Sequence, residues 1–99
     1  MIKIYNITMK TPFGTQNGRI TFVINGSSLT GVLEGMGSKS KFINGKINGD
    51  DFEFSGEIKT LLIKIHYFAK GTLNNNKLTA SVNTNHGIFS VTGHLVSKS

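Results

Sequence analysis

The 99-residue chain contains no cysteine, no tryptophan and only one proline, Pro12. The lack of cysteine excludes disulfide bonds, a thiolate nucleophile and a cysteine-ligated metal site. No apolar stretch approaches about 18 residues, which excludes a membrane-spanning helix. The chain also lacks the run of alanine, leucine and glutamate that a helical bundle requires. What is left is a small protein built from short elements.

Size and composition predict one globular domain over residues 1–99. Hydrophobic residues make up 37% of the chain and charged residues only 16%, which is too apolar and too weakly charged for intrinsic disorder. A chain of this length buries one modest core. The N-terminal run from Met1 to Asn6 is not followed by the apolar segment of a secretory signal, so we expect a cytoplasmic protein and no membrane partner.

The net charge of +6 invites a nucleic-acid interpretation, and the basic residues argue against it. Ten of the eleven are lysines and only Arg19 is an arginine, whereas base and phosphate recognition favours the bidentate guanidinium. The lysines are also scattered along the chain. We interpret them as solvated surface charge.

Apolar and polar residues alternate from one end of the chain to the other, which is the period of a strand with one buried face. Phe52, Phe54 and Ile58 share one face, for example, with Glu53 and Glu57 on the other. The pattern predicts eight strands, at about residues 2–10, 16–24, 29–36, 39–47, 51–58, 61–70, 77–84 and 87–96.

Turn signals separate these runs at intervals of about 10–12 residues, a spacing typical of an all-β sandwich or barrel. Asn-Gly, which suits the positive φ angles of a tight hairpin turn, occurs four times. The four dipeptides are Asn17-Gly18, Asn25-Gly26, Asn44-Gly45 and Asn48-Gly49. We therefore predict an eight-stranded antiparallel up-and-down barrel, a meander whose closure removes both exposed edges.

The turn and strand pattern resembles the small calycin or lipocalin-like barrel modules of bacteria. The resemblance is carried by Thr11 to Gly14, by Leu29-Thr30-Gly31, by the turn from Asn44 to Asp50 with Phe52-Glu53-Phe54 after it, and by Gly93. It implies a barrel that holds one ligand, and it includes no catalytic motif. The tryptophans that avidins and lipocalins carry are absent.

Function follows from what fills such a barrel, and three hypotheses remain open. The first is non-catalytic binding of a small apolar ligand in a pocket lined by Phe22, Phe52, Phe54 and Tyr67. The second is an enzyme whose interior holds one acid or base, namely Glu34, Tyr67 or an inward His94. The third is an interaction module with a solid core. A pocket of about 300 Å³ or more supports binding, and a filled interior supports the third hypothesis.

Two phenylalanines, Phe42 and Phe68, fall on the predicted outer faces, which predicts a self-association surface and a homodimer. The histidines do not converge. His86 and His94 lie at the two ends of the last strand, and His66 shares an outer face with Lys64 and Lys70. We therefore predict no metal site and no cofactor.

Overall fold

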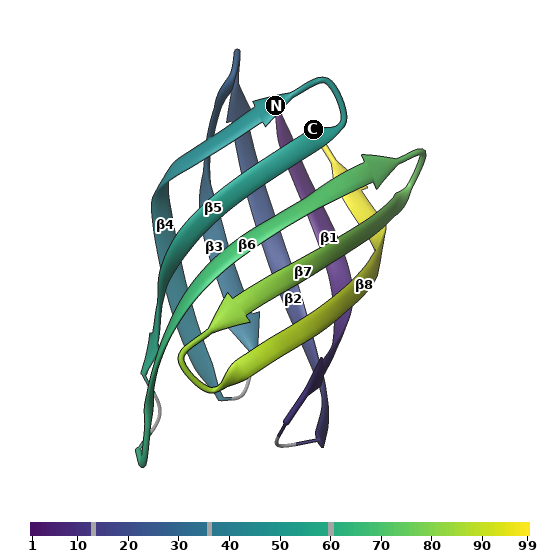
Figure 1. Ribbon diagram of the computed structural model, residues 1–99. Coiled ribbons are helices and arrows are strands. Elements are labelled where there is room, and N and C mark those ends of the chain that lie inside the picture. The colour runs from purple at the N-terminus through teal and green to yellow at the C-terminus, as the bar shows by residue number, and fades with distance from the viewer. Residues whose placement is uncertain (13, 36, 60) are drawn as a thin grey trace.

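The computed structural model describes residues 1–12, 14–35, 37–59 and 61–99, and it is all-β as predicted (Figure 1). Within this part of the chain, no helix is long and apolar enough to cross a membrane. The eight strands are β1 (Ile2–Thr11), β2 (Gly14–Asn25), β3 (Ser28–Gly35), β4 (Ser38–Asn48), β5 (Asp51–Lys59), β6 (Lys64–Asn74), β7 (Lys77–Thr84) and β8 (Gly87–Lys98). Residue 36, where we expected the third strand to end, lies outside the described residues.

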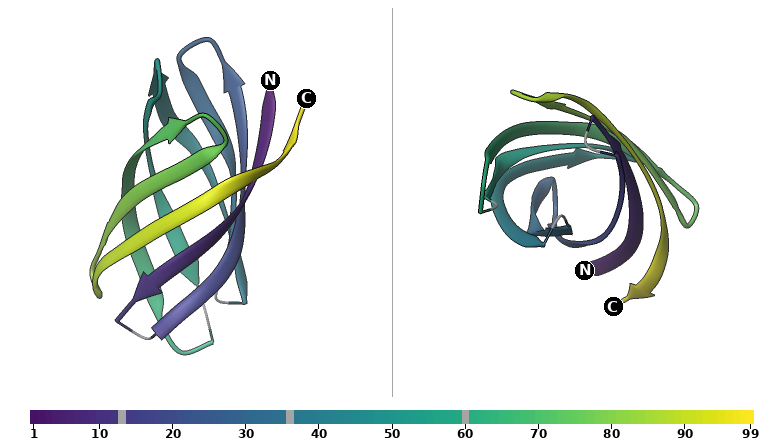
Figure 2. Two further views of the ribbon diagram at one scale, coloured as in Figure 1. Left: turned by 90° about the vertical axis from the view of Figure 1, so that its right-hand side faces the viewer. Right: turned by 90° about the horizontal axis from the view of Figure 1, so that it is seen from below.

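Each strand pairs antiparallel with its sequence neighbours, and β1 pairs with β8 to close the barrel (Figures 1 and 2). The closing ladder runs along β1 from Lys3 to Lys10. Two backbone bonds between Ile2 and Ser99 extend it, with N···O distances of 2.7 and 2.8 Å. The predicted up-and-down barrel is therefore confirmed. It is elongated, measuring 36 × 22 × 19 Å.

Two of the four Asn-Gly dipeptides lie at turns, as predicted. Gly26 and Gly49 follow the last residues of β2 and β4 and have φ angles of +64° and +63°. Asn25 and Asn48 are still strand residues. The glycine is thus the first turn residue, which is the position where a type II′ hairpin turn needs positive φ.

The other two Asn-Gly dipeptides were wrongly predicted as turns, because they lie inside β2 and β4. Here the glycine is needed for close approach of the neighbouring strand. A Cβ atom on Gly18 would lie 2.3 Å from the Glu34 carbonyl oxygen, and one on Gly45 would lie 2.6 Å from the Leu29 carbonyl oxygen. Both contacts are far inside van der Waals distance, so only glycine fits.

The outward assignment of Phe42 was wrong as well: its side chain is buried, with 2% exposed. The cause is a β-bulge, since the β3–β4 register shifts between the pairs Gly31–Phe42 and Leu29–Gly45. Two consecutive residues of β4, Ile43 and Asn44, both face outward there. Phe42 and Gly45 therefore both point inward although they are three positions apart, a spacing that regular alternation would place on opposite faces.

The sixth strand begins at Lys64, three residues later than predicted. Leu61, where we expected the strand to begin, is fully exposed, and Leu62 beside it is 93% exposed. These leucines belong to the β5–β6 connection at the lower end of the barrel. A run of apolar residues that continues past a strand end carries no signal for the boundary itself.

The faces of the third and eighth strands are those of the regular alternation. Leu29 and Leu33 are buried in β3, and Phe89 and Val91 are buried in β8. Glu34 and His94 therefore point away from the interior. The buried side chains of the described strands form one continuous core along the barrel axis.

The opposite placement of Phe42 and Phe68 predicts opposite stability effects. Phe42→Ala removes a buried ring and should lower the free energy of unfolding by about 3–5 kcal/mol. Phe68 is 42% exposed, and Phe68→Ala should change the free energy of unfolding by no more than about 0.5–1 kcal/mol. Urea unfolding of both variants measures the difference. Equal losses would contradict the bulge in β4.

Candidate functional site

The predicted ligand residues all lie inside the barrel. Phe22 comes from β2, Phe52 and Phe54 from β5 and Tyr67 from β6, and none is more than 4% exposed. Three of them, Phe52, Phe54 and Tyr67, line the interior cavity. Phe22 does not line it, because its ring is surrounded by other rings.

Phe22 is the centre of an aromatic cluster that fills the middle of the barrel. Its ring centroid lies 5.1 Å from that of Phe52, 5.8 Å from that of Tyr5 and 6.2 Å from that of Phe42. The Phe42 and Phe54 rings stack on each other at 3.9 Å. Such contacts contribute to stability beyond the area they bury. Phe52 and Phe54 belong to this cluster and also line the cavity, so the cluster forms one wall of the cavity.

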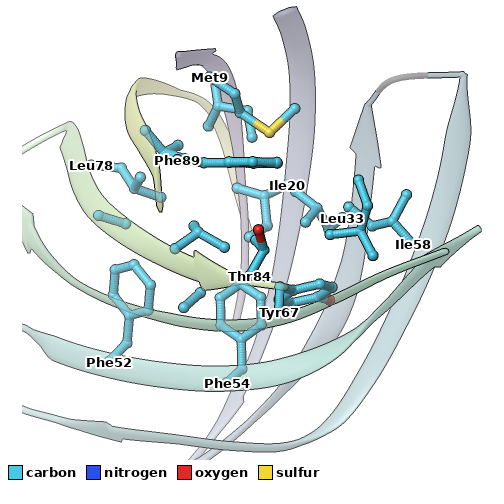
Figure 3. Close-up of a pocket in the computed structure, with 16 residues that line it drawn as sticks. Met9, Ile20, Leu33, Phe52, Phe54, Ile58, Tyr67, Leu78, Thr84 and Phe89 are labelled. Carbon is cyan, nitrogen blue, oxygen red and sulfur yellow. The ribbon is translucent and has the colours of Figure 1, made fainter. Parts of the chain in front are cut away.

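The cavity is small and apolar. Its free volume is about 20 Å³, enough for about one water-sized sphere. Met9 and Phe89 approach it from one side and Phe54 and Tyr67 from the other, with Leu33 and Ile58 at its edge (Figure 3). An apolar void of this kind offers a water no hydrogen-bond partners. The space suits apolar matter, and it is far below the roughly 300 Å³ of a preformed ligand pocket.

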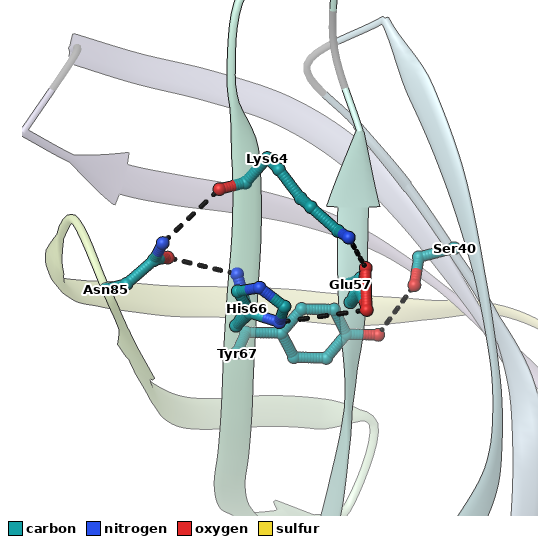
Figure 4. Close-up of polar contacts among 6 residues, drawn as sticks. All are labelled: Ser40, Glu57, Lys64, His66, Tyr67 and Asn85. Carbon is teal, nitrogen blue, oxygen red and sulfur yellow. Dashed lines mark hydrogen bonds and ion pairs between the residues drawn. The ribbon is translucent and has the colours of Figure 1, made fainter.

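A buried polar pair lies beside the cavity. The Ser40 hydroxyl and the Tyr67 hydroxyl are hydrogen bonded at 3.0 Å, and both side chains are buried (Figure 4). Gly56 makes room for this arrangement, since a Cβ atom there would lie 2.7 Å from the Tyr67 hydroxyl oxygen. Burial raises the pKa of Tyr67, and the bond to Ser40 offsets part of that rise.

The Ser40–Tyr67 pair bridges a gap in the backbone ladder. Among the described residues, β4 and β5 pair through their backbones only from Lys46–Glu53 to Asn48–Asp51. We call the part of the two strands without these pairs the seam, namely residues 38–44 of β4 and 54–59 of β5. Besides Ser40–Tyr67, side-chain bonds from Ser38 to the Lys59 carbonyl (2.8 Å) and between Asn44 and Ser55 (2.9 and 3.2 Å) cross it. The wall beside the cavity is thus held by side chains.

Asn85 plays a similar part on the other side of β6. Its amide accepts a bond from the His66 backbone N–H at 3.0 Å and donates to the Lys64 carbonyl at 3.3 Å (Figure 4). β7 ends at Thr84, so the side chain replaces the ladder that the strand no longer supplies. On the outer surface, Glu57 forms an ion pair with Lys64 at 3.2 Å. This bond is the main cause of the lowered pKa of Glu57.

The second tyrosine, Tyr5, is fully buried and its hydroxyl has no hydrogen-bond partner among the described residues. Burial raises its pKa. Tyr5 does not line the cavity. Burying its hydroxyl therefore carries a desolvation penalty that no hydrogen bond from the described residues compensates.

The enzyme hypothesis needs one inward acid or base among three alternatives. Tyr67 is inside, and Glu34 and His94 lie on the outer surface. No group of three histidine, aspartate or glutamate side chains in the described ranges could hold a metal ion. Ser40, Phe42 and Asn44 were not predicted from the sequence, because their roles depend on the bulge. Only the odd spacing of Phe42 and Gly45 hinted at it.

The comparisons with known proteins support the fold. No protein-family model matches the chain, and no curated protein matches it. Among solved structures it is similar to a redesigned β-barrel, mFAP1, determined bound to DFHBI. The TM-score is 0.68 with 19% sequence identity, over 95% of this chain and 92% of that chain. A likeness at this identity concerns the closed eight-stranded barrel and does not identify a family.

The two tyrosines predict opposite effects of losing a hydroxyl. Tyr67→Phe leaves the buried Ser40 hydroxyl without its partner and should cost about 1–3 kcal/mol. Tyr5→Phe removes a hydroxyl that has no partner and should raise stability by up to about 1 kcal/mol. Each kcal/mol corresponds to about 4–8 °C in Tm for a domain of this size. If thermal melts give Tyr5→Phe a lower Tm than the unsubstituted protein, the hydroxyl of Tyr5 is not buried without a partner.

Both raised tyrosine pKa values predict loss of stability in alkali. Unfolded tyrosines ionise near pH 10, and the folded ones do so later. The unfolded state therefore releases its protons first. The stabilisation is complete below about pH 10 and is lost as pH rises through the folded pKa values. Tyrosinate absorbance should appear together with unfolding, since the chain has only these two tyrosines. Ionisation of both near pH 10 in folded protein would contradict this.

Proposed function

We propose that this protein binds a small apolar molecule at the interior cavity. The proposal rests on the apolar lining of the interior, supplied by Phe52, Phe54 and Tyr67 among others, and on the seam beside it, since the free volume of the cavity is below that of a preformed pocket. The proposal includes kinship with small calycin-like barrels, whose ligands lie inside. It is supported by the redesigned barrel of similar fold that was determined bound to DFHBI.

The size of the cavity sets the terms of binding. A free volume of about 20 Å³ holds no organic molecule, so the ligand must make its own space. The seam is where the wall can yield, because side-chain bonds rather than a backbone ladder join β4 to β5 there. Met9 can also yield, since its unbranched side chain adapts to irregular space. We expect a ligand of about one or two rings.

The rival is the interaction module with a solid core, and it has its own support. The cavity is small, and Phe68 and Ile88 lie exposed on the outer face of β6 and β8 at 42% and 66%. Asn83 of β7 pairs with both and completes one row across the three strands. In this alternative the row is the contact surface of a homodimer.

A thermal-shift titration with indole tests the proposal. At about ten times Kd, mass action adds about 1.4 kcal/mol, which should raise Tm by about 6–10 °C. Ala69→Val places two methyl groups in the cavity and should abolish the shift. Thr72→Val makes an outward change on the same strand and should leave the shift unchanged.

The controls separate the two functions. Circular dichroism of both variants checks that the barrel is folded. An unchanged Tm with indole, benzene and decanoic acid overturns ligand binding in the cavity. If light scattering then gives the mass of a dimer that Phe68→Asp dissociates, the interaction module takes its place.

A further inference from the structure

The outer surface has a groove of about 570 Å³ over β8, β1, β2 and β3. These strands include the two that close the barrel, seen on one side in Figure 2. The groove runs across the strands. It opens to solvent, and the interior cavity of the proposed function lies on the opposite face of the sheet behind Ile7, which borders both.

The strand register places four side chains in one outward row along this groove. His94 of β8 is opposite Asn6 of β1, Asn6 is opposite Arg19 of β2, and Arg19 is opposite Glu34 of β3. Directly opposed residues have Cβ atoms about 4.5–5.5 Å apart. The only arginine of the chain therefore has an amide and an imidazole on one side of it and a carboxylate on the other.

The floor of the groove is backbone. The next row along the strands consists of Ile7, Gly18 and Gly35, which are paired across β1, β2 and β3. Ile7 points inward and is buried, and the two glycines have no side chain. Thr8 and Asn17 form the far edge, where their side-chain oxygens lie 3.4 Å apart. The low floor lets a ligand lie against the polar row.

The polar row is not neutralised by the protein itself. Within the described ranges, the ion pairs join Glu57 to Lys64 and to His66. Arg19 and Glu34 are opposite one another without forming such a pair, and Asn6 and His94 make no side-chain hydrogen bond to another described residue. Arginine carries five N–H donors in a planar fork, which matches the oxygens of a carboxylate or phosphate.

We propose that this groove binds the oxyanion of a small molecule, a carboxylate or a phosphate, above Asn6. The Arg19 guanidinium and the His94 imidazole reach the anion from either side, and the Asn6 amide donates from below. Glu34 lies beyond Arg19, repels a second anion and accepts a hydrogen bond from a hydroxyl or amine of the ligand. The net charge of +6 adds attraction for anions.

The experiment is a titration followed by ¹H–¹⁵N NMR, with inorganic phosphate in one arm and succinate in the other, at near-physiological salt. Saturable shifts should centre on the amides of Asn6, Arg19 and His94 in at least one arm, and the arm that saturates identifies the oxyanion. Arg19→Ala should weaken binding by at least about tenfold, because hydrogen bonds to charged groups are the strong ones. Arg19→Lys keeps the positive charge but loses the planar fork of donors, so its affinity should lie between those of the unsubstituted protein and Arg19→Ala.

Two further variants make the test specific. Lys70→Ala removes the same charge from β6, four strands away around the barrel, and should change affinity by less than about twofold. Glu34→Gln should strengthen binding of inorganic phosphate, because it removes the neighbouring negative charge. Equal weakening by Arg19→Ala and Lys70→Ala would assign the binding to net charge and overturn the proposal, as would the absence of saturable shifts at the row in both arms.

Discussion

The structure depends on the limited space inside eight closed strands. An eight-stranded barrel leaves an interior just wide enough for its own side chains, so each large inward residue needs a small one beside it. Gly31 faces Phe42, whose ring atom would be 2.9 Å from a Cβ there, and Gly56 faces Tyr67. The aromatic cluster around Phe22 is the result, and the cavity is the small volume that this packing leaves over.

The same constraint places the weakest part of the wall next to the cavity. The bulge in β4 turns Phe42 inward to complete the cluster, and below it the β4–β5 backbone ladder is absent over the described residues. Ser38 and Asn44 then join β4 to β5 through side chains, and Ser40 joins β4 to Tyr67 of β6. Backbone satisfaction is obligatory in a buried wall, so polar side chains appear where the ladder stops. The small apolar cavity and the side-chain-held wall beside it are thus linked to one distortion.

The outer surface obeys a different rule, because nothing fills it. Alternation sends every second residue outward, and the register decides which of these meet. Arg19, Asn6 and His94 are 13 or more residues apart in sequence, and the closure of β1 on β8 brings them into one row. The inward-facing residues between the two outward rows leave a backbone floor. Alternation exposes these polar groups, and the closure of the barrel between β1 and β8 brings them together along one groove.

The period of the sequence by itself determined the all-β class, the number and order of the strands and nearly all of the inner face, including Phe22, Phe52, Phe54 and Tyr67. These depend on neighbours two residues away, which a single chain displays. Only the tertiary structure decided the inward turn of Phe42, the start of β6 after the exposed Leu61, and the pairing of Ser40 with Tyr67. Each depends on what lies opposite in another strand: Thr30 beside the bulge, or a hydroxyl 27 residues away. Local alternation is encoded residue by residue, whereas register and filled volume exist only once the sheet has closed.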